Sequence, residues 1–174
     1  KECERSSDYL PNMVKLRELL SDVTNQQRMI VLLGGLGMSA LHCAAYRNHP
    51  EMITTILSSL NSSEKFNILT AEVYRHRTPL HVAAQWGSAE SVEAILNSLR
   101  SKQQLQLLKV QKDGETAIEM ASGQVFGRLL KYGLKASGAI RNGECYPAGR
   151  KLLLEFEFRY FAYGKFAKFK FPKV

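Results

Sequence analysis

Residues 78–84, TPLHVAA, predict the start of a short α-helix. Thr78 suits the N-cap position, because its hydroxyl can accept a hydrogen bond from an unpaired amide of the first turn. Pro79 suits the first helical position, where its missing N–H group costs nothing. The apolar residues that follow at helical spacing give this helix one small, apolar face.

Two related stretches occur at nearly the same distance on either side. Residues 39–45 are SALHCAA, and residues 116–122 are TAIEMAS, so the spacings are 39 and 38 residues. A constant period of this size is typical of repeat proteins, in which successive units stack on one another.

A longer second helix is predicted in the first two units, over residues 51–60 and 90–99. Asn48 and Gly87 precede these helices, and both residue types suit the left-handed conformation that ends a helix. Each second helix carries an apolar stripe that a single helix pair cannot bury, so the units must stack. An additional short helical segment follows at residues 62–70 and 101–110, with residues 24–33 as its upstream counterpart.

These residues resemble ankyrin repeats. The ankyrin pattern places a polar turn, often Asp-Gly, before Thr-Pro-Leu-His-x-Ala-Ala, followed by a break, a Glu and an apolar second helix. The positions that match it are Leu41, His42, Ala44, Ala45, His49, Glu51, Ile53, Thr78, Pro79, Leu80, His81, Ala83, Ala84, Gly87, Glu90, Val92, Asp113, Gly114, Thr116 and Ala121. The resemblance covers about three units and a half, residues 13–134.

The resemblance implies an all-α helical solenoid with short loop or hairpin connections. Residues 1–12 are predicted to be a loose N-terminus, 13–134 the repeat array, 135–150 a linker, and 151–174 a basic, aromatic tail. Arg75 and His76 replace the Asp-Gly turn of the middle unit. Ile118 and Glu119 replace Leu and His in the last unit, whose second helix is predicted to be short, near residues 125–132. We interpret this last unit as a C-terminal cap.

No catalytic or cofactor site is predicted. We interpret His42 and His81 as structural, bonded to a neighbouring backbone or a Thr hydroxyl; a metal or catalytic role is less favoured, because no Asp or Cys cluster repeats beside them. Residues 35–40, GLGMSA, fit a dinucleotide-binding fingerprint. That alternative lacks the second strand and its terminal acidic residue, and the repeat explains the same glycines.

The net charge of +8 is concentrated in the C-terminal part of the chain. Residues 135–174 contain nine basic and three acidic residues, so they carry six of the eight net charges. The three cysteines are irregularly spaced, which favours reduced thiols over a disulfide framework or a zinc cluster. Reduced thiols in turn predict an intracellular protein, in the cytoplasm or the nucleus.

Ankyrin arrays bind partner proteins on a concave face, formed by the loop tips and the exposed side of each first helix. The resemblance therefore implies another protein as the partner, and no small-molecule substrate. Among the expected binding residues, Trp86 and Tyr46 are of the types enriched in binding hot spots. The residues at these positions are Tyr46, Arg47, Tyr74, Arg75, His76, Gln85, Trp86 and Lys112.

The tail, residues 151–174, leaves several alternatives open. Its first half alternates charged and aromatic residues with a period of two, which favours a strand and a hairpin near Tyr163 and Gly164. Lysines interleaved with phenylalanines also suit RNA or single-stranded DNA, or an anionic membrane. The remaining alternative is a disordered or non-native end.

Overall fold

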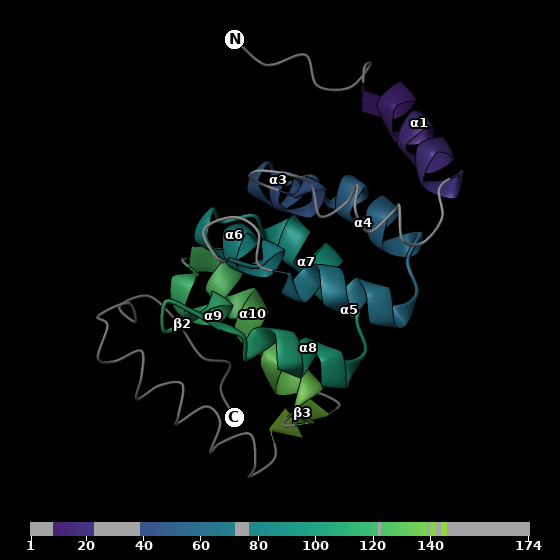
Figure 1. Ribbon diagram of the computed structural model, residues 1–174. Coiled ribbons are helices and arrows are strands. Elements are labelled where there is room, and N and C mark those ends of the chain that lie inside the picture. The colour runs from purple at the N-terminus through teal and green to yellow at the C-terminus, as the bar shows by residue number, and fades with distance from the viewer. Residues whose placement is uncertain are drawn as a thin grey trace.

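The computed structural model describes residues 9–22, 39–71, 77–121, 123–138, 140–141 and 144–145. Successive helical units stack along one direction, from α1 at one end to α10 at the other (Figure 1). The predicted all-α solenoid is thereby confirmed. The predicted segments 24–33 and 151–174, and the glycine-rich residues 34–37, lie outside the described residues.

Each unit begins with a short first helix and continues with a second helix. The first helices are α3 (Ala40–Tyr46), α6 (Pro79–Gln85) and α9 (Ala117–Met120). The second helices are α4 (Pro50–Ser58), α7 (Ala89–Asn97) and α10 (Gly123–Ala136). Two units add a third helix, α5 (Ser62–Thr70) and α8 (Ser101–Leu108), and α1 (Tyr9–Ser21) precedes them all.

The helices form parallel rows. α3 packs on α6 and α6 on α9, while α1, α4, α7 and α10 make a second row, and α5 packs on α8. The predicted apolar stripes lie between these rows, and the side chains of Ile53, Ile56, Val92 and Ile95 are fully buried. Isolated helices need about 12 residues to be even marginally stable in water. The first helices have seven residues in α3 and α6 and four in α9, so they depend on this packing.

Hydroxyl caps start the first helices, as the sequence predicts. The hydroxyl of Ser39 accepts a hydrogen bond from the backbone N–H of His42, and that of Thr78 accepts one from the N–H of His81, both at 3.4 Å. Thr116 caps α9 in the same way. These caps fix where each unit begins.

A left-handed residue ends the first helices α3 and α6. Asn48 has a φ of 54° and Gly87 a φ of 73°. The next residue donates its backbone N–H back into the helix, from His49 to Ala44 O and from Ser88 to Ala83 O, each at 2.9 Å. This Schellman arrangement satisfies the last carbonyl groups and turns the chain into the second helix.

Asn48 also caps a helix of the next unit. Ser88 makes no side-chain cap on α7, and the Asn48 Oδ1 instead accepts the backbone N–H and the hydroxyl of Ser91, both at 3.1 Å. Its amide nitrogen donates to the carboxylate of Glu90. One residue therefore ends a helix in its own unit and begins another in its neighbour.

A tight hairpin introduces the last unit. Strands β1 (Gln111–Lys112) and β2 (Glu115–Thr116) pair antiparallel across Asp113 and Gly114. Both turn residues have positive φ, 53° and 82°, which is the conformation that two-residue hairpins of this kind require. The turn predicted from Asp-Gly is confirmed.

Three element boundaries differ from the predictions. α1 begins at Tyr9 rather than residue 13, because Pro11 falls in the first turn, where a missing N–H is tolerated. The last second helix is not short: α10 has 14 residues, since packing on α7 and α8 overrides its helix-weakening glycines. The predicted linker 135–150 includes the end of α10 and a second hairpin, β3 (Ile140–Arg141) with β4 (Glu144–Cys145).

Substitutions of Gly87 test whether the turn requires a residue that tolerates a positive φ. A Cβ atom at Gly87 would meet no atom within 4 Å, so only the positive φ opposes a side chain there. We expect Gly87→Ala to lower the free energy of unfolding by about 1 kcal/mol. Gly87→Asn is expected to cost less, because Asn tolerates this conformation and occupies the equivalent position 48. Chemical denaturation of both variants measures the difference, and equal losses would contradict the explanation.

Candidate interaction surface

Buried histidines join the first helices to the segments that follow. The ring Nε2 of His42 lies 2.8 Å from the backbone oxygen of Arg77, and its Nδ1 lies 2.6 Å from the Ser39 hydroxyl. A carbonyl oxygen can only accept, so Nε2 carries the proton and Nδ1 accepts from the hydroxyl. Burial lowers the pKa of His42, partly opposed by the bond to the Arg77 backbone. His42 is therefore a neutral structural bridge between units, as predicted.

His81 repeats the local part of this arrangement. Its Nδ1 lies 2.7 Å from the Thr78 hydroxyl, and its side chain is fully buried. Burial lowers the pKa of His81 to about 4; interactions with the backbone of Glu115 and Val110 oppose the effect, and the charge of Arg77 adds to it. Nε2 of His81 has no hydrogen-bond partner within the described part of the chain. A buried neutral ring of this kind has no access to a substrate.

Glu119 takes the place of the histidine in the last unit. Its carboxylate accepts hydrogen bonds from the backbone N–H and the hydroxyl of Thr116, at 2.6 Å and 2.8 Å. The Thr116 hydroxyl in turn accepts the backbone N–H of Glu119. The sequence departure at this position is thus a capping box, which secures the start of α9 from within its own unit.

An aromatic pair is exposed where α3 and α6 end. Tyr46 is 43% exposed and Trp86 is 57% exposed. Their ring centroids are 4.8 Å apart and their planes meet at 74°, which is an edge-to-face contact. The pair joins two successive units and presents aromatic surface to the solvent. The structure therefore brings together two of the large aromatics of the predicted binding set, Tyr46 and Trp86.

Polar side chains flank this aromatic pair. Arg47 and Gln85 are exposed and are sequence neighbours of Tyr46 and Trp86. The guanidinium of Arg77 donates through Nη1 to the side-chain oxygen of Gln85. We call these five residues, Tyr46, Arg47, Arg77, Gln85 and Trp86, the aromatic–arginine surface.

Some predicted site residues lie elsewhere. Lys112 is only 9% exposed, so its side chain is not part of the exposed surface; it lies on β1, in the hairpin that precedes α9. The hairpin pairing that covers it could not be inferred from its polar sequence context. Tyr74, Arg75 and His76 lie outside the described residues, and their role stays a prediction.

Arg77 was not among the residues predicted from the sequence. It directly precedes the N-cap residue Thr78, so its backbone oxygen meets the histidine of the preceding unit while its side chain reaches Gln85. The repeat register could have identified Arg77, because it occupies the same position before the N-cap residue as Glu115 does in the next unit. Its position relative to the N-cap residue therefore predicts its role better than its place in the polar loop does.

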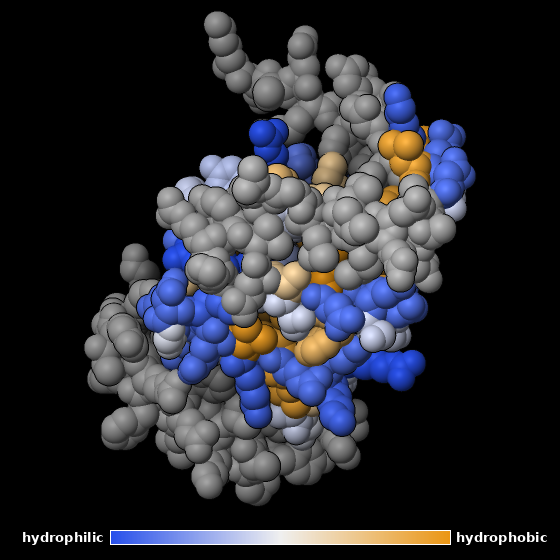
Figure 2. Space-filling view, in the orientation of Figure 1, coloured by the Kyte–Doolittle hydropathy of each residue, from blue (hydrophilic) through white to orange (hydrophobic). Residues whose placement is uncertain are grey.

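Apolar side chains are also exposed on α1. Val14 and Leu19 are 53% and 57% exposed, and apolar surface is visible over this helix in Figure 2. Leu20 of the same helix is buried in the core. The contact of α1 with the stack therefore uses Leu20, whereas Val14 and Leu19 remain exposed to solvent.

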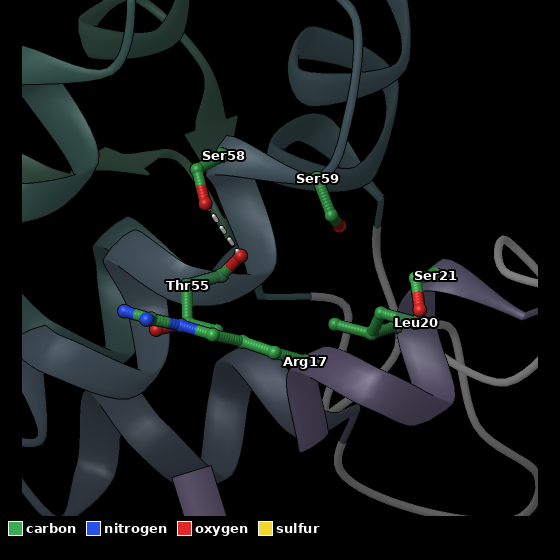
Figure 3. A pocket seen from close by; sticks show the side chains of 6 residues that line it. All are labelled: Arg17, Leu20, Ser21, Thr55, Ser58 and Ser59. Carbon is green, nitrogen blue, oxygen red and sulfur yellow. Dashed lines mark hydrogen bonds between the residues drawn. The ribbon is translucent and has the colours of Figure 1, made fainter. Parts of the chain in front are cut away.

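A pocket lies between α1 and α4. Figure 3 shows the residues that line it, Arg17, Leu20, Ser21, Thr55, Ser58 and Ser59. The three serine hydroxyls each donate to a backbone carbonyl three residues earlier, at 2.7–2.9 Å. They serve the C-terminal turns of their own helices, and the lining contains no pair of acid and base groups that could share a proton.

Within the described ranges, no group of three or more His, Cys, Asp or Glu side chains could hold a metal ion. No helix in that part of the chain is long and apolar enough to cross a membrane.

A family model described as ankyrin repeats (3 copies) matches residues 12–106, more than half of the chain. The chain belongs to the ankyrin repeat family. No curated protein matches it. Ankyrin repeats are protein–protein interaction scaffolds and are typically not catalytic. The unit formed by the β1–β2 hairpin, α9 and α10 lies beyond the matched residues, but it keeps the hydroxyl cap and the stacking of the ankyrin units before it.

The buried state of His81 predicts a pH dependence of stability. In the unfolded chain His81 titrates near its ordinary pKa of about 6.5, whereas in the folded chain burial lowers the pKa to about 4. The unfolded state therefore binds more protons between these values, and the free energy of unfolding falls as the pH drops from about 6.5 to about 4. His81→Asn is expected to be less stable at neutral pH but to show a shallower fall.

Two measurements check this expectation. Urea denaturation at several pH values gives the slope for the wild type and for His81→Asn. Nitrogen NMR of the ring, recorded at pH 5, shows whether His81 is still neutral in the folded chain. A protonated ring at that pH, or identical slopes for the two proteins, would contradict the assignment.

Proposed function

We propose that this ankyrin repeat protein is a non-catalytic module that binds a partner protein through the aromatic–arginine surface. The observation that carries the proposal is the exposed pair of Tyr46 and Trp86, which spans two units. Aromatic residues and arginine are the types most enriched in binding hot spots. Burying two such rings in an interface removes a large apolar area from water.

The way the rings are held also supports binding. Both stand at helix ends whose backbone is fixed by Schellman hydrogen bonds and by the left-handed residues Asn48 and Gly87. The His42 bridge to Arg77 ties together the two units that carry the rings. A surface that is ordered before binding loses less conformational entropy when a partner docks.

Nucleic-acid or anionic-membrane binding through residues 151–174 remains the alternative. Those residues lie outside the described part of the chain, and the alternative rests on their basic, aromatic composition. Binding of this kind would weaken strongly as the salt concentration rises, and this dependence would come from residues 151–174 rather than from Trp86.

Trp86→Ala tests the proposed surface. We expect this variant to weaken partner binding about 30-fold, which corresponds to a hot-spot loss of about 2 kcal/mol. Tyr46→Ala is expected to weaken the same partner, because it removes the other ring of the pair. Affinity capture with the full chain, followed by quantitative mass spectrometry, compares the proteins retained by each variant, and titration with the purified partner gives the affinities.

Leu19→Ala is the matched control. Leu19 is exposed to the same 57% as Trp86 but lies on α1. It should retain the partner, and circular dichroism should show unchanged helical content in all three variants. If Trp86→Ala retained the partner while Leu19→Ala lost it, the binding surface would be α1 instead. Loss of helical content in Trp86→Ala would show that the ring is part of the core.

A further inference from the structure

The exposed charges of the aromatic–arginine surface have one sign. The sequences of α3 and α6 contain no Asp or Glu. Arg47 directly follows Tyr46 and is exposed, and the guanidinium of Arg77 reaches Gln85 next to Trp86. Two guanidinium groups therefore flank the aromatic pair along the chain.

Neither arginine is neutralised by an ion pair within the described residues. The Arg77 Nη1 donates to the neutral amide of Gln85, so its positive charge is not balanced there, and its Nε is buried without a hydrogen-bond partner among the described residues. By contrast, Arg128 of α10 is paired with the carboxylate of Glu93 on α7. Arg128 thus differs in its charge balance from Arg47 and Arg77.

The acidic residue at the start of α7 is already engaged. The carboxylate of Glu90 accepts a hydrogen bond from the Asn48 amide, and this bond is the main cause that lowers the pKa of Glu90. One carboxylate oxygen of Glu90 is therefore already hydrogen-bonded to Asn48 in the preceding unit.

From these contacts we infer the chemistry of the partner: an acidic peptide segment with an aromatic or aliphatic anchor. The anchor packs against the rings of Tyr46 and Trp86, and carboxylates on either side of it bind the guanidinium groups of Arg47 and Arg77. Guanidinium and carboxylate groups match in planar, two-bond geometry, which favours Asp or Glu at those positions. The inference rests on the proposed function, because it takes the same surface as the binding site.

Single-stranded nucleic acid is the competing occupant, since bases stack on aromatic rings and phosphates bind arginine. The geometry favours the peptide. The two rings meet edge to face, at 74°, so they do not form parallel platforms for successive bases. A single side chain can instead pack against the corner that the two rings make.

Selection from a library of random peptides displayed on phage, with the full chain as bait, tests the inference. We expect the enriched peptides to combine Asp or Glu with an aromatic or aliphatic residue. For a synthetic peptide from this set, Arg47→Glu should weaken binding about 30-fold, since the change replaces an attractive charge by a repulsive one. Lys102→Glu makes the same change of charge on the exposed side of α8, and we expect it to weaken binding less than about 3-fold.

The outcomes separate the two proposals. If Trp86→Ala weakens the peptide and Arg47→Glu does not, the surface is correct and its acidic partner is wrong. If neither variant weakens the peptide, both proposals fail. Failure to enrich acidic peptides, or tighter binding of an oligouridylate RNA that depends on Arg47 and Trp86, overturns the inference. Equal losses for Arg47→Glu and Lys102→Glu would mean that only net charge matters, and would overturn it too.

Discussion

One partly buried hydrogen bond joins the first two units: the His42 ring donates through Nε2 to the backbone oxygen of Arg77. The Ser39 hydroxyl donates to the other ring nitrogen, Nδ1, and so holds the neutral ring in the tautomer that carries its proton on Nε2. Helices as short as α3 and α6 would not persist alone. Their stability comes from neighbours, through this bond, the buried apolar stripes and the cap that Asn48 places on α7. The chain therefore behaves as a stack in which each unit completes the next.

The same constraint places the residues of the proposed binding surface. Because α3 and α6 are held side by side, Tyr46 and Trp86 meet at their ends, although 40 positions separate them in the sequence. The arginine whose backbone accepts the His42 bond sends its side chain along α6 to Gln85. Arg77 thus contributes both to the stack and to the proposed surface: its carbonyl accepts the bond from His42, and its half-buried guanidinium donates to Gln85 next to Trp86.

Features set by a few adjacent residues could be predicted from the sequence. The cap at Thr78, the structural bonding of His81 and the turn at Asp113 and Gly114 depend on local chemistry that recurs in register. Most features set by contacts between units could not, although the bond of His42 to a neighbouring backbone was expected. The link from Asn48 to Ser91 joins residues 43 positions apart. The length of α10 depends on packing against α7 and α8, which outweighs the low helix propensity of its glycines. The aromatic contact likewise needed the stacking geometry, although both of its residues were expected at the surface.

The central claim is that two adjacent ankyrin units, held together by the His42 bridge, form one binding surface at Trp86. Site-specific photocrosslinking in the full chain tests it most directly. A photoreactive phenylalanine analogue at position 86 should form a covalent adduct with the partner, and the same analogue at position 106, exposed on α8, should form none. An adduct at position 106, with none at position 86, would place the partner elsewhere on the stack and contradict the account.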